Sequence, residues 1–155
     1  QLNIHHFIIN AGGDIYAQGH KRDNKSWRIA IEDPFEPGIV TSLEVKEDTS
    51  IFTSGNYQRF FKDEDGNIRH HIINPKTGAP SVSISSATVI HQDPMIADVA
   101  ATVLMLTNIK DAKHMAQRLK ISDYLIINEQ KQMFASPSML TRLDLSSLQR
   151  FSVQP

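Results

Sequence analysis

Asp98 and Thr102 stand one helical turn apart in the otherwise apolar stretch Pro94–Thr107, so their side chains share a face. Asp93-Pro94 is typical of a helix start, an N-cap followed by proline. Because apolar residues occupy every side, we expect this helix to be buried. A buried carboxylate is costly unless it is paired or holds a cation, and a carboxylate beside a hydroxyl suits Mg²⁺. The structural alternative is that Asp98 caps a loop while Thr102 bonds to its own helix.

Two adjacent histidines lead into a turn. His70 and His71 precede Asn74–Gly78, where Asn-Pro initiates the turn and glycine supplies a positive φ. Neighbouring residues of a strand point to opposite faces, so only one of the two imidazoles is expected in a site. His71 enters the turn directly and is the candidate general base, since histidine titrates near neutrality. The alternative is a turn with an incidental histidine.

The segment Thr53–Arg59 contains residue types that bind ligands. Gly55 permits a close approach of the backbone, Tyr57 can pack on a ring, and Arg59 can pair with a carboxylate or phosphate. The same pattern is also typical of a polar loop next to a strand.

A second glycine segment lies at Asn10–Asp14. Gly12 and Gly13 are adjacent and precede a carboxylate, an arrangement that can hold a phosphate through backbone N–H groups. Between two apolar runs the same pair also predicts a hairpin turn.

The elements that position these residues follow from hydrophobic periodicity and turn residues. Strands come first along the chain and helices later, with one return to strand, which indicates an α+β fold rather than a doubly wound one. We expect a mixed or antiparallel sheet packed against two or three helices. Strands are predicted at Phe7–Asn10, Ile15–Ala17, Trp27–Ile31, Ile39–Val45, Ser50–Thr53, Val82–Ile90, Tyr124–Ile127 and Gln132–Phe134, and helices at Pro94–Thr107, Asn108–Lys120 (capped by Asn108) and Pro137–Leu143.

Composition limits the function to a local site. The 155 residues carry 16 Lys and Arg against 17 Asp and Glu, a net charge of −1. This balance offers no electrostatic footprint for nucleic acid and no polybasic stripe for a membrane. The hydrophobic share of 40% is enough for a core, and we expect one domain over residues 1–155. The absence of cysteine excludes disulfides, thiolate metal sites and a cysteine nucleophile.

Taken together, the segments resemble the ApbE-type FAD:protein FMN transferases, a family formerly called thiamine biosynthesis lipoproteins. The matching segments have the order and spacing of the family and cover most of Ile8–Leu106; they are Asn10–Asp14, Thr53–Arg59, His70–Gly78 and Ala97–Thr102.

The resemblance implies a transferase that moves FMN from FAD to a threonine of a target protein and releases AMP. Mg²⁺ then sits on the FAD pyrophosphate, with Asp98 and Thr102 as its ligands, and His71 deprotonates the acceptor hydroxyl. Two alternatives use nearly the same site: an FAD pyrophosphatase, in which water replaces threonine, and a non-catalytic flavin-binding module.

The resemblance also implies which residues line the FAD. Asn74 occupies a position that is usually aspartate in the family, so the turn is kept but a charge is lost. Tyr57 and Arg59 are expected to hold their loop rather than to contact the nucleotide. The five positions expected beside FAD are Gly12, Gly13, Ile72, Asn74 and Thr77.

Members of the family are considerably longer than this chain. Their segment before the Asn-Ala-Gly-Gly-Asp motif carries another metal ligand, a Lys-Gly motif and part of the nucleotide cleft. We therefore expect a C-terminal portion that is inactive alone and whose uncovered apolar surface promotes a homo-oligomer. The implied location is extracytoplasmic, as a bacterial membrane lipoprotein or on the periplasmic side, with membrane contact only through an anchor outside this chain. The implied partners are FAD and the acceptor protein.

Overall fold

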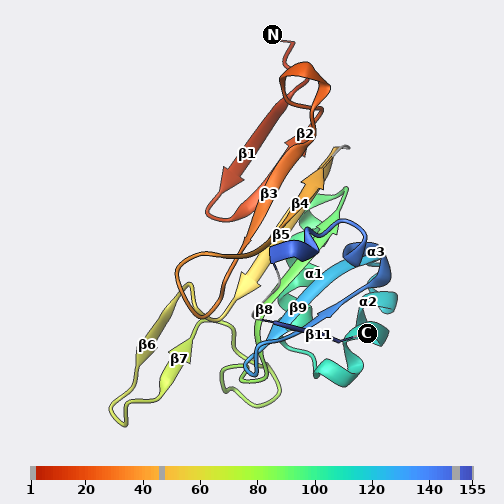
Figure 1. The fold of residues 1–155 in the computed structure, drawn as a ribbon. Coiled ribbons are helices and arrows are strands. Elements are labelled where there is room, and N and C mark those ends of the chain that lie inside the picture. The colour runs from red at the N-terminus through yellow and green to blue at the C-terminus, as the bar shows by residue number, and fades with distance from the viewer. Residues whose placement is uncertain (1–2, 46–47, 148–150, 155) are drawn as a thin grey trace.

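The computed structural model describes residues 3–45, 48–147 and 151–154. Within these residues a seven-stranded sheet has the order β1-β2-β5-β8-β9-β10-β11 (Figure 1). Every pairing in it is antiparallel except that of β10 with β11, so the expected α+β fold with a mixed sheet is confirmed. The sheet strands are β1 (Phe7–Ala11), β2 (Asp14–Gln18), β5 (Thr49–Gly55), β8 (Ile84–His91), β9 (Asp123–Asn128), β10 (Gln132–Ala135) and β11 (Ser152–Gln154).

The remaining elements cover or extend the sheet. Two strand pairs stand apart from it, β3 (Trp27–Glu32) with β4 (Ile39–Val45), and β6 (Phe60–Lys62) with β7 (Ile68–His70). The helices are α1 (Pro94–Met105), α2 (Ala112–Arg118) and α3 (Pro137–Leu140). Short 3₁₀ turns lie at Arg22–Asn24, Ile109–Asp111 and Leu145–Ser147. No helix in the described ranges is long and apolar enough to cross a membrane.

The period of two along each strand divides the interior into two cores. In β9, Leu125 and Ile127 belong to the core under β3–β4, whereas Ile126 between them belongs to the core under α1 and α2. In β5, Ile51 and Phe52 divide in the same way. The sheet is thus a middle layer, with the β3–β4 ribbon and α3 on one face and α1 and α2 on the other.

Helix α1 is half-exposed, which corrects the expectation of a buried helix. Its outer face carries Met95, 72% exposed, and Val99, 55% exposed, with Asp98 also exposed between them. The sheet covers only one side of the helix, so the apolar residues of the other side stay at the surface. Asp98 is therefore not a buried carboxylate. The inner face consists of small and apolar residues that pack on β5 and β8, namely Ala97, Ala100, Ala101, Leu104 and Met105.

The helix ends follow the sequence signals in part. The Asp93 side chain accepts hydrogen bonds from the N–H groups of Met95 and Ile96, as the predicted cap requires. Asn108, the other predicted cap, makes no side-chain cap bond, and the chain first forms a 3₁₀ turn before α2 begins at Ala112. Helix α3 has the predicted start, with Ser136 as its cap, but ends at Leu140.

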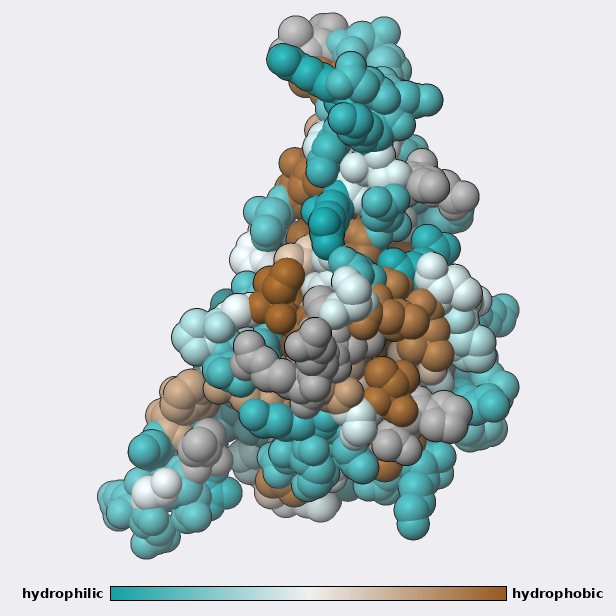
Figure 2. Space-filling view, in the orientation of Figure 1, coloured by the Kyte–Doolittle hydropathy of each residue, from teal (hydrophilic) through white to brown (hydrophobic). Residues whose placement is uncertain are grey.

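Two hairpins project from the layered body (Figure 1). The β1–β2 hairpin was predicted, and its two-residue turn places Gly12 at φ 73° and Gly13 at φ 108°. The β6–β7 hairpin was not predicted, because its strands have three residues each. Figure 2 shows hydrophilic residues over both projecting ends and hydrophobic residues gathered over the central body in that view.

Candidate functional site

Two carboxylates face each other across the helix side of the sheet. Asp14 opens β2, and its neighbour Ile15 packs into the opposite core, so the Asp14 side chain points toward α1. Burial raises the pKa of the Asp14 carboxyl, the negative charge of Asp98 raises it further, and a hydrogen bond from the Thr53 backbone lowers it. The two negative charges are therefore near enough to repel, which a cation between or beside them would relieve.

Two hydroxyls lie next to these carboxylates in the fold. Ser54 Oγ and Thr102 Oγ1 are 3.0 Å apart and join β5 to α1. Thr102 stands one turn after Asp98 on the helix, so the hydroxyl pair shares its face. The Thr53 side chain points the other way and bonds to Thr88 of β8 at 2.9 Å. Of these two neighbouring residues of β5, only Ser54 therefore faces the helix side.

The oxygen groups fit a hard cation such as Mg²⁺. Carboxylate and hydroxyl oxygens are the donors that this ion prefers, and it normally keeps several waters or substrate phosphates in its shell. No set of three or more His, Cys, Asp or Glu side chains is placed to hold a metal within the described ranges. Asp14, Asp98 and Thr102 would therefore need ligand oxygens from a substrate to complete such a site.

His71 lies at the surface beside Arg59, the last residue of the segment Thr53–Arg59. The Arg59 carbonyl oxygen is 3.3 Å from both the backbone nitrogen and Nδ1 of His71. A carbonyl oxygen only accepts, so the proton of the neutral ring belongs on Nδ1 and Nε2 is left bare. His70, its neighbour, is 6% exposed. One histidine is thus buried and its neighbour exposed, which agrees with the prediction that they face opposite sides.

The loop after His71 is held by backbone hydrogen bonds. The Asn74 carbonyl accepts from the N–H groups of Thr77 and Gly78, and its Oδ1 accepts from Lys76 N–H at 2.9 Å. Gly78 has φ 68°, the positive value that the turn was predicted to need. Asn74 therefore shapes this turn without a carboxylate, through an amide oxygen.

Tyr57 packs on Gly55 within the segment Thr53–Arg59, and the expectation that Tyr57 and Arg59 hold this loop stays a prediction. A Cβ atom on Gly55 would overlap the Tyr57 ring, so glycine at this position lets the ring pack there. Burial raises the pKa of the Tyr57 phenol to about 12, with the charge of Glu32 as the next cause. Gly13 is close to the same segment, since a Cβ on it would lie 3.6 Å from the Gln58 amide nitrogen.

The structure brings several of the predicted site residues together, but it buries Ile72, which was expected beside FAD. Asp98, Thr102 and the glycine turn meet around Asp14 and Ser54, two residues that sequence reasoning did not select. Both follow from the pairing of β2 with β5, which the sequence alone does not show. Ile72 is 6% exposed, its N–H donates to His70 Nδ1 and its carbonyl accepts from the Ser81 N–H, so its contact with FAD stays a prediction.

Solved structures share this arrangement of layers. The ApbE protein of Thermotoga maritima aligns with a TM-score of 0.80 at 27% identity, over 88% of this chain and 44% of that one. The flavin transferase ApbE of Vibrio cholerae aligns with a TM-score of 0.68 at 31% identity, over 89% of this chain and 44% of that one. The fold is therefore that of a large part of an ApbE structure.

The chain belongs to the ApbE family, whose model matches residues 1–126. The FAD:protein FMN transferase of Rhodobacter capsulatus is 35% identical over 138 residues, which are 88% of this chain and 26% of that protein. The enzyme of the same name from Haemophilus influenzae is 34% identical, over 82% of this chain and 37% of that protein. The chain spans less than half the length of these relatives.

Proposed function

We propose that the protein carrying this chain transfers FMN from FAD to a threonine of an acceptor protein in the presence of Mg²⁺. The observation that carries the proposal is the meeting of Asp14, Asp98 and the Ser54–Thr102 hydroxyl pair on one side of the sheet. Unpaired negative charge beside hydroxyl oxygens is suited to a cation that in turn binds a pyrophosphate. The name of the relatives supplies the substrate class.

Asp98 and Thr102 are proposed to hold the cation. Asp98 is exposed, so its charge is available to a ligand rather than used within the core. Bound Mg²⁺ neutralises charge on a pyrophosphate and so favours departure of the AMP group. Asp14 supplies further negative charge from β2, which strengthens the attraction for a cation.

His71 is proposed to accept the proton of the attacking threonine. With Nδ1 directed at the Arg59 carbonyl, Nε2 is the free acceptor, and its exposure leaves it accessible to an acceptor protein. The threonine oxygen forms a bond to the FMN phosphorus, the bond from that phosphorus to the AMP oxygen breaks, and AMP leaves with the electron pair. The proton that threonine loses goes to His71.

The FAD contacts are proposed to come from the two turns. Gly12 and Gly13 are exposed at the tip of β1–β2, and Thr77 is exposed in the turn that Asn74 shapes. The Gly12–Gly13 turn is held by Asn10, whose Oδ1 accepts from the Gly13 N–H at 2.9 Å. Such turns present backbone groups to phosphates without interference from side chains.

The direct test uses the protein at its native length with FAD, Mg²⁺ and an acceptor peptide that contains threonine. We expect one AMP released for each flavin attached to the peptide. His71→Ala should lower this rate by about 10²–10⁴-fold, the usual contribution of a lost general base, with little change in FAD affinity. His114→Ala, an exposed histidine on α2, is the matched control.

Other outcomes of this experiment would replace the proposal. AMP release without flavin on the peptide would make the protein an FAD pyrophosphatase, with water as the nucleophile. FAD binding without any AMP would make it a flavin-binding module. We further propose an extracytoplasmic location, on the family resemblance, and fractionation of cells that express the native-length protein tests it.

A further inference from the structure

His70 makes two hydrogen bonds to the backbone from a buried position at the end of β7. Its Nε2 lies within hydrogen-bond distance of the Ser81 carbonyl oxygen, and its Nδ1 lies 3.3 Å from the Ile72 backbone nitrogen. The carbonyl can only accept and the amide can only donate. The ring therefore carries its proton on Nε2 and is a neutral, single tautomer in this position.

Ser81 connects this contact to the helix that carries Asp98 and Thr102. The Ser81 N–H donates to the Ile72 carbonyl at 3.1 Å, which closes the neck of the loop 71–81. The Ser81 hydroxyl donates to the carbonyl of Met105 at 2.6 Å, and Met105 is the last residue of α1. His70, Ser81 and the end of α1 thus form one continuous chain of hydrogen bonds.

Besides these hydrogen bonds, the loop is attached to the body by Ile72, which is buried in the core under α1 and α2. Its own hydrogen bonds close the Asn74–Gly78 turn, and Ile73 forms an isolated bridge with Pro80. Outside the loop, His71 contacts the Arg59 carbonyl on the exposed side. The neck at His70 is the place where hydrogen bonds connect the loop to α1.

We infer that His70 is a positioning residue for the loop that presents His71, an inference that rests on the proposed role of His71. An apolar side chain could fill the buried space but would leave the Ser81 carbonyl and the Ile72 N–H without their partner. The imidazole satisfies a donor and an acceptor at once and ties them to α1. His70 thereby fixes the distance between the proton acceptor and the residues proposed to hold the cation.

Three replacements of His70 separate these contacts, in the protein at its native length. His70→Gln keeps a donor for the Ser81 carbonyl, His70→Asn keeps an acceptor for the Ile72 N–H, and His70→Leu keeps neither. For each variant we measure kcat, KM for FAD, Tm and the hydrogen exchange of the loop amides from residue 74 to residue 81. His114→Ala serves again as the control.

We expect His70→Leu to lower kcat by about 10–100-fold, the cost of a misplacement near 1 Å, with KM for FAD within about twofold. Exchange of the loop amides should accelerate in the Leu variant and return toward the original rate in the Gln variant. In a His71→Ala background, His70→Leu should lower kcat no further, because a positioning residue acts through the residue it positions.

Two results would overturn the inference. One is an additional loss of the same size when His70→Leu is combined with His71→Ala, which would mark a general effect on folding. The other is an unchanged kcat and unchanged loop exchange in His70→Leu. An unchanged kcat in His71→Ala would overturn the proposed role of His71 instead, and the exchange measurement would still decide whether His70 orders the loop.

Discussion

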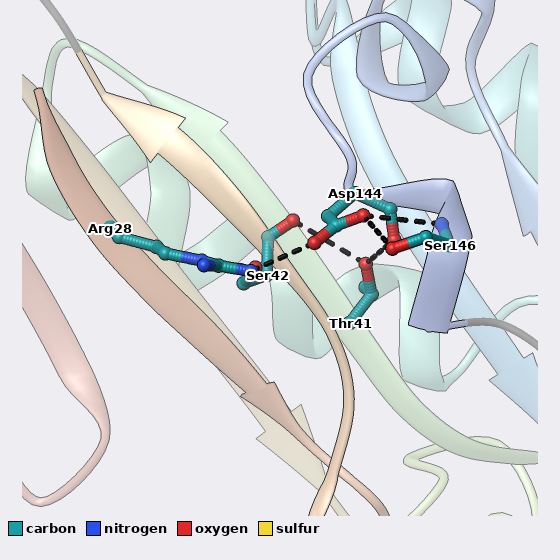
Figure 3. A network of polar contacts seen from close by, with 5 residues as sticks. All are labelled: Arg28, Thr41, Ser42, Asp144 and Ser146. Carbon is teal, nitrogen blue, oxygen red and sulfur yellow. Dashed lines mark hydrogen bonds and ion pairs between the residues drawn. The ribbon is translucent and has the colours of Figure 1, made fainter.

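Two clusters of polar side chains, one around Asp144 and one around Asp14, lie on different sides of the sheet. Asp144 faces a positive charge, whereas Asp14 faces a negative one. On the β3–β4 side, Asp144 pairs with Arg28 at 2.8 Å, and Arg28 also donates to Ser42 Oγ (Figure 3). Thr41 donates to the Asp144 carbonyl oxygen at 2.8 Å. Hydrogen bonds from the Ser146 side chain and backbone, followed by the charge of Arg28, lower the pKa of the Asp144 carboxyl.

On the α1 side the surroundings of the carboxylate are reversed. Asp14 faces the like charge of Asp98, and both burial and that charge raise the pKa of its carboxyl. A cluster with opposite charges in contact holds two segments of the chain together. Like charges that are close enough to repel each other favour a bound cation, and carboxyl groups with perturbed pKa values are typical of functional sites.

Replacement of Asp98 should produce the largest effect on activity. Asp98→Asn keeps the shape of the side chain and removes one of the two negative charges, so we expect flavin transfer to fall by at least about 100-fold. Titration of the native-length protein with Mg²⁺ is the measurement. If Asp98→Asn kept the original Mg²⁺ dependence, the cation site would be wrongly assigned and Asp98 would be an ordinary surface residue.

The same replacement in the other cluster should leave the chemistry almost unchanged. Asp144→Asn removes the partner of Arg28, so we expect a slightly lower Tm and a transfer rate within about twofold of the original. Both quantities are measured on the protein at its native length. A loss of activity as large as that of Asp98→Asn would contradict the distinction between a structural cluster and a functional one.

The longer strands were largely predictable from the sequence, because alternation of apolar residues is a local signal. Strand β4 was predicted with its observed bounds, Ile39–Val45, and β8 was predicted as a central strand. The hairpin of β6 and β7 was missed since strands of three residues show little periodicity. The exposure of α1 was predicted wrongly, because a sequence does not say how much of an apolar helix its own chain covers.

The site was predictable only where motif residues act through local geometry. The Asn74–Gly78 turn and the burial of His70 beside an exposed His71 follow from neighbouring residues. The meeting of Asp14 with Asp98 depends on the pairing of β2 with β5 and the packing of α1 on β5, contacts between residues far apart in the sequence. Sequence periodicity contains no information on such distant pairings, so Asp14 was not selected as a site residue.

Replacement of Asp14 should stabilise the fold while it weakens cation binding. Asp14→Asn keeps an acceptor for the Thr53 backbone and removes the repulsion with Asp98. We expect a gain in the free energy of unfolding of less than about 1 kcal/mol at neutral pH, because the carboxyl is only partly buried and solvent screens the repulsion. The Mg²⁺ concentration for half-maximal transfer should rise. Chemical denaturation and Mg²⁺ titration measure the two effects, and a destabilised variant would contradict the repulsion.

The smallest expected effect is a difference in pH dependence. Asp14 and Asp144 should change the stability of the folded protein over different pH ranges. The pKa of Asp14 is raised in the folded state, so folding favours its protonated form. The stability that Asp14 contributes to the folded state is fully present below 3.8, the pKa of the carboxyl in the unfolded chain. It is lost as pH rises above 3.8 through the raised pKa of the folded state. The pKa of Asp144 is lowered, so its contribution is present above 3.8 and is lost as pH falls below 3.8.

The difference in Tm between each Asn variant and the original protein should therefore change on opposite sides of pH 3.8. The Tm of Asp14→Asn should exceed that of the original protein by a margin that grows as pH rises from about 4 toward neutrality. In that range only the original protein carries the Asp14 negative charge beside Asp98. The Tm of Asp144→Asn should be lower than that of the original protein by a constant amount in that range, and this difference should shrink only in stronger acid. Thermal unfolding from about pH 3 to pH 7 measures both curves. If the two differences changed over the same pH range, the carboxylates would have similar surroundings, and the contrast between a paired and a repelled aspartate would not hold.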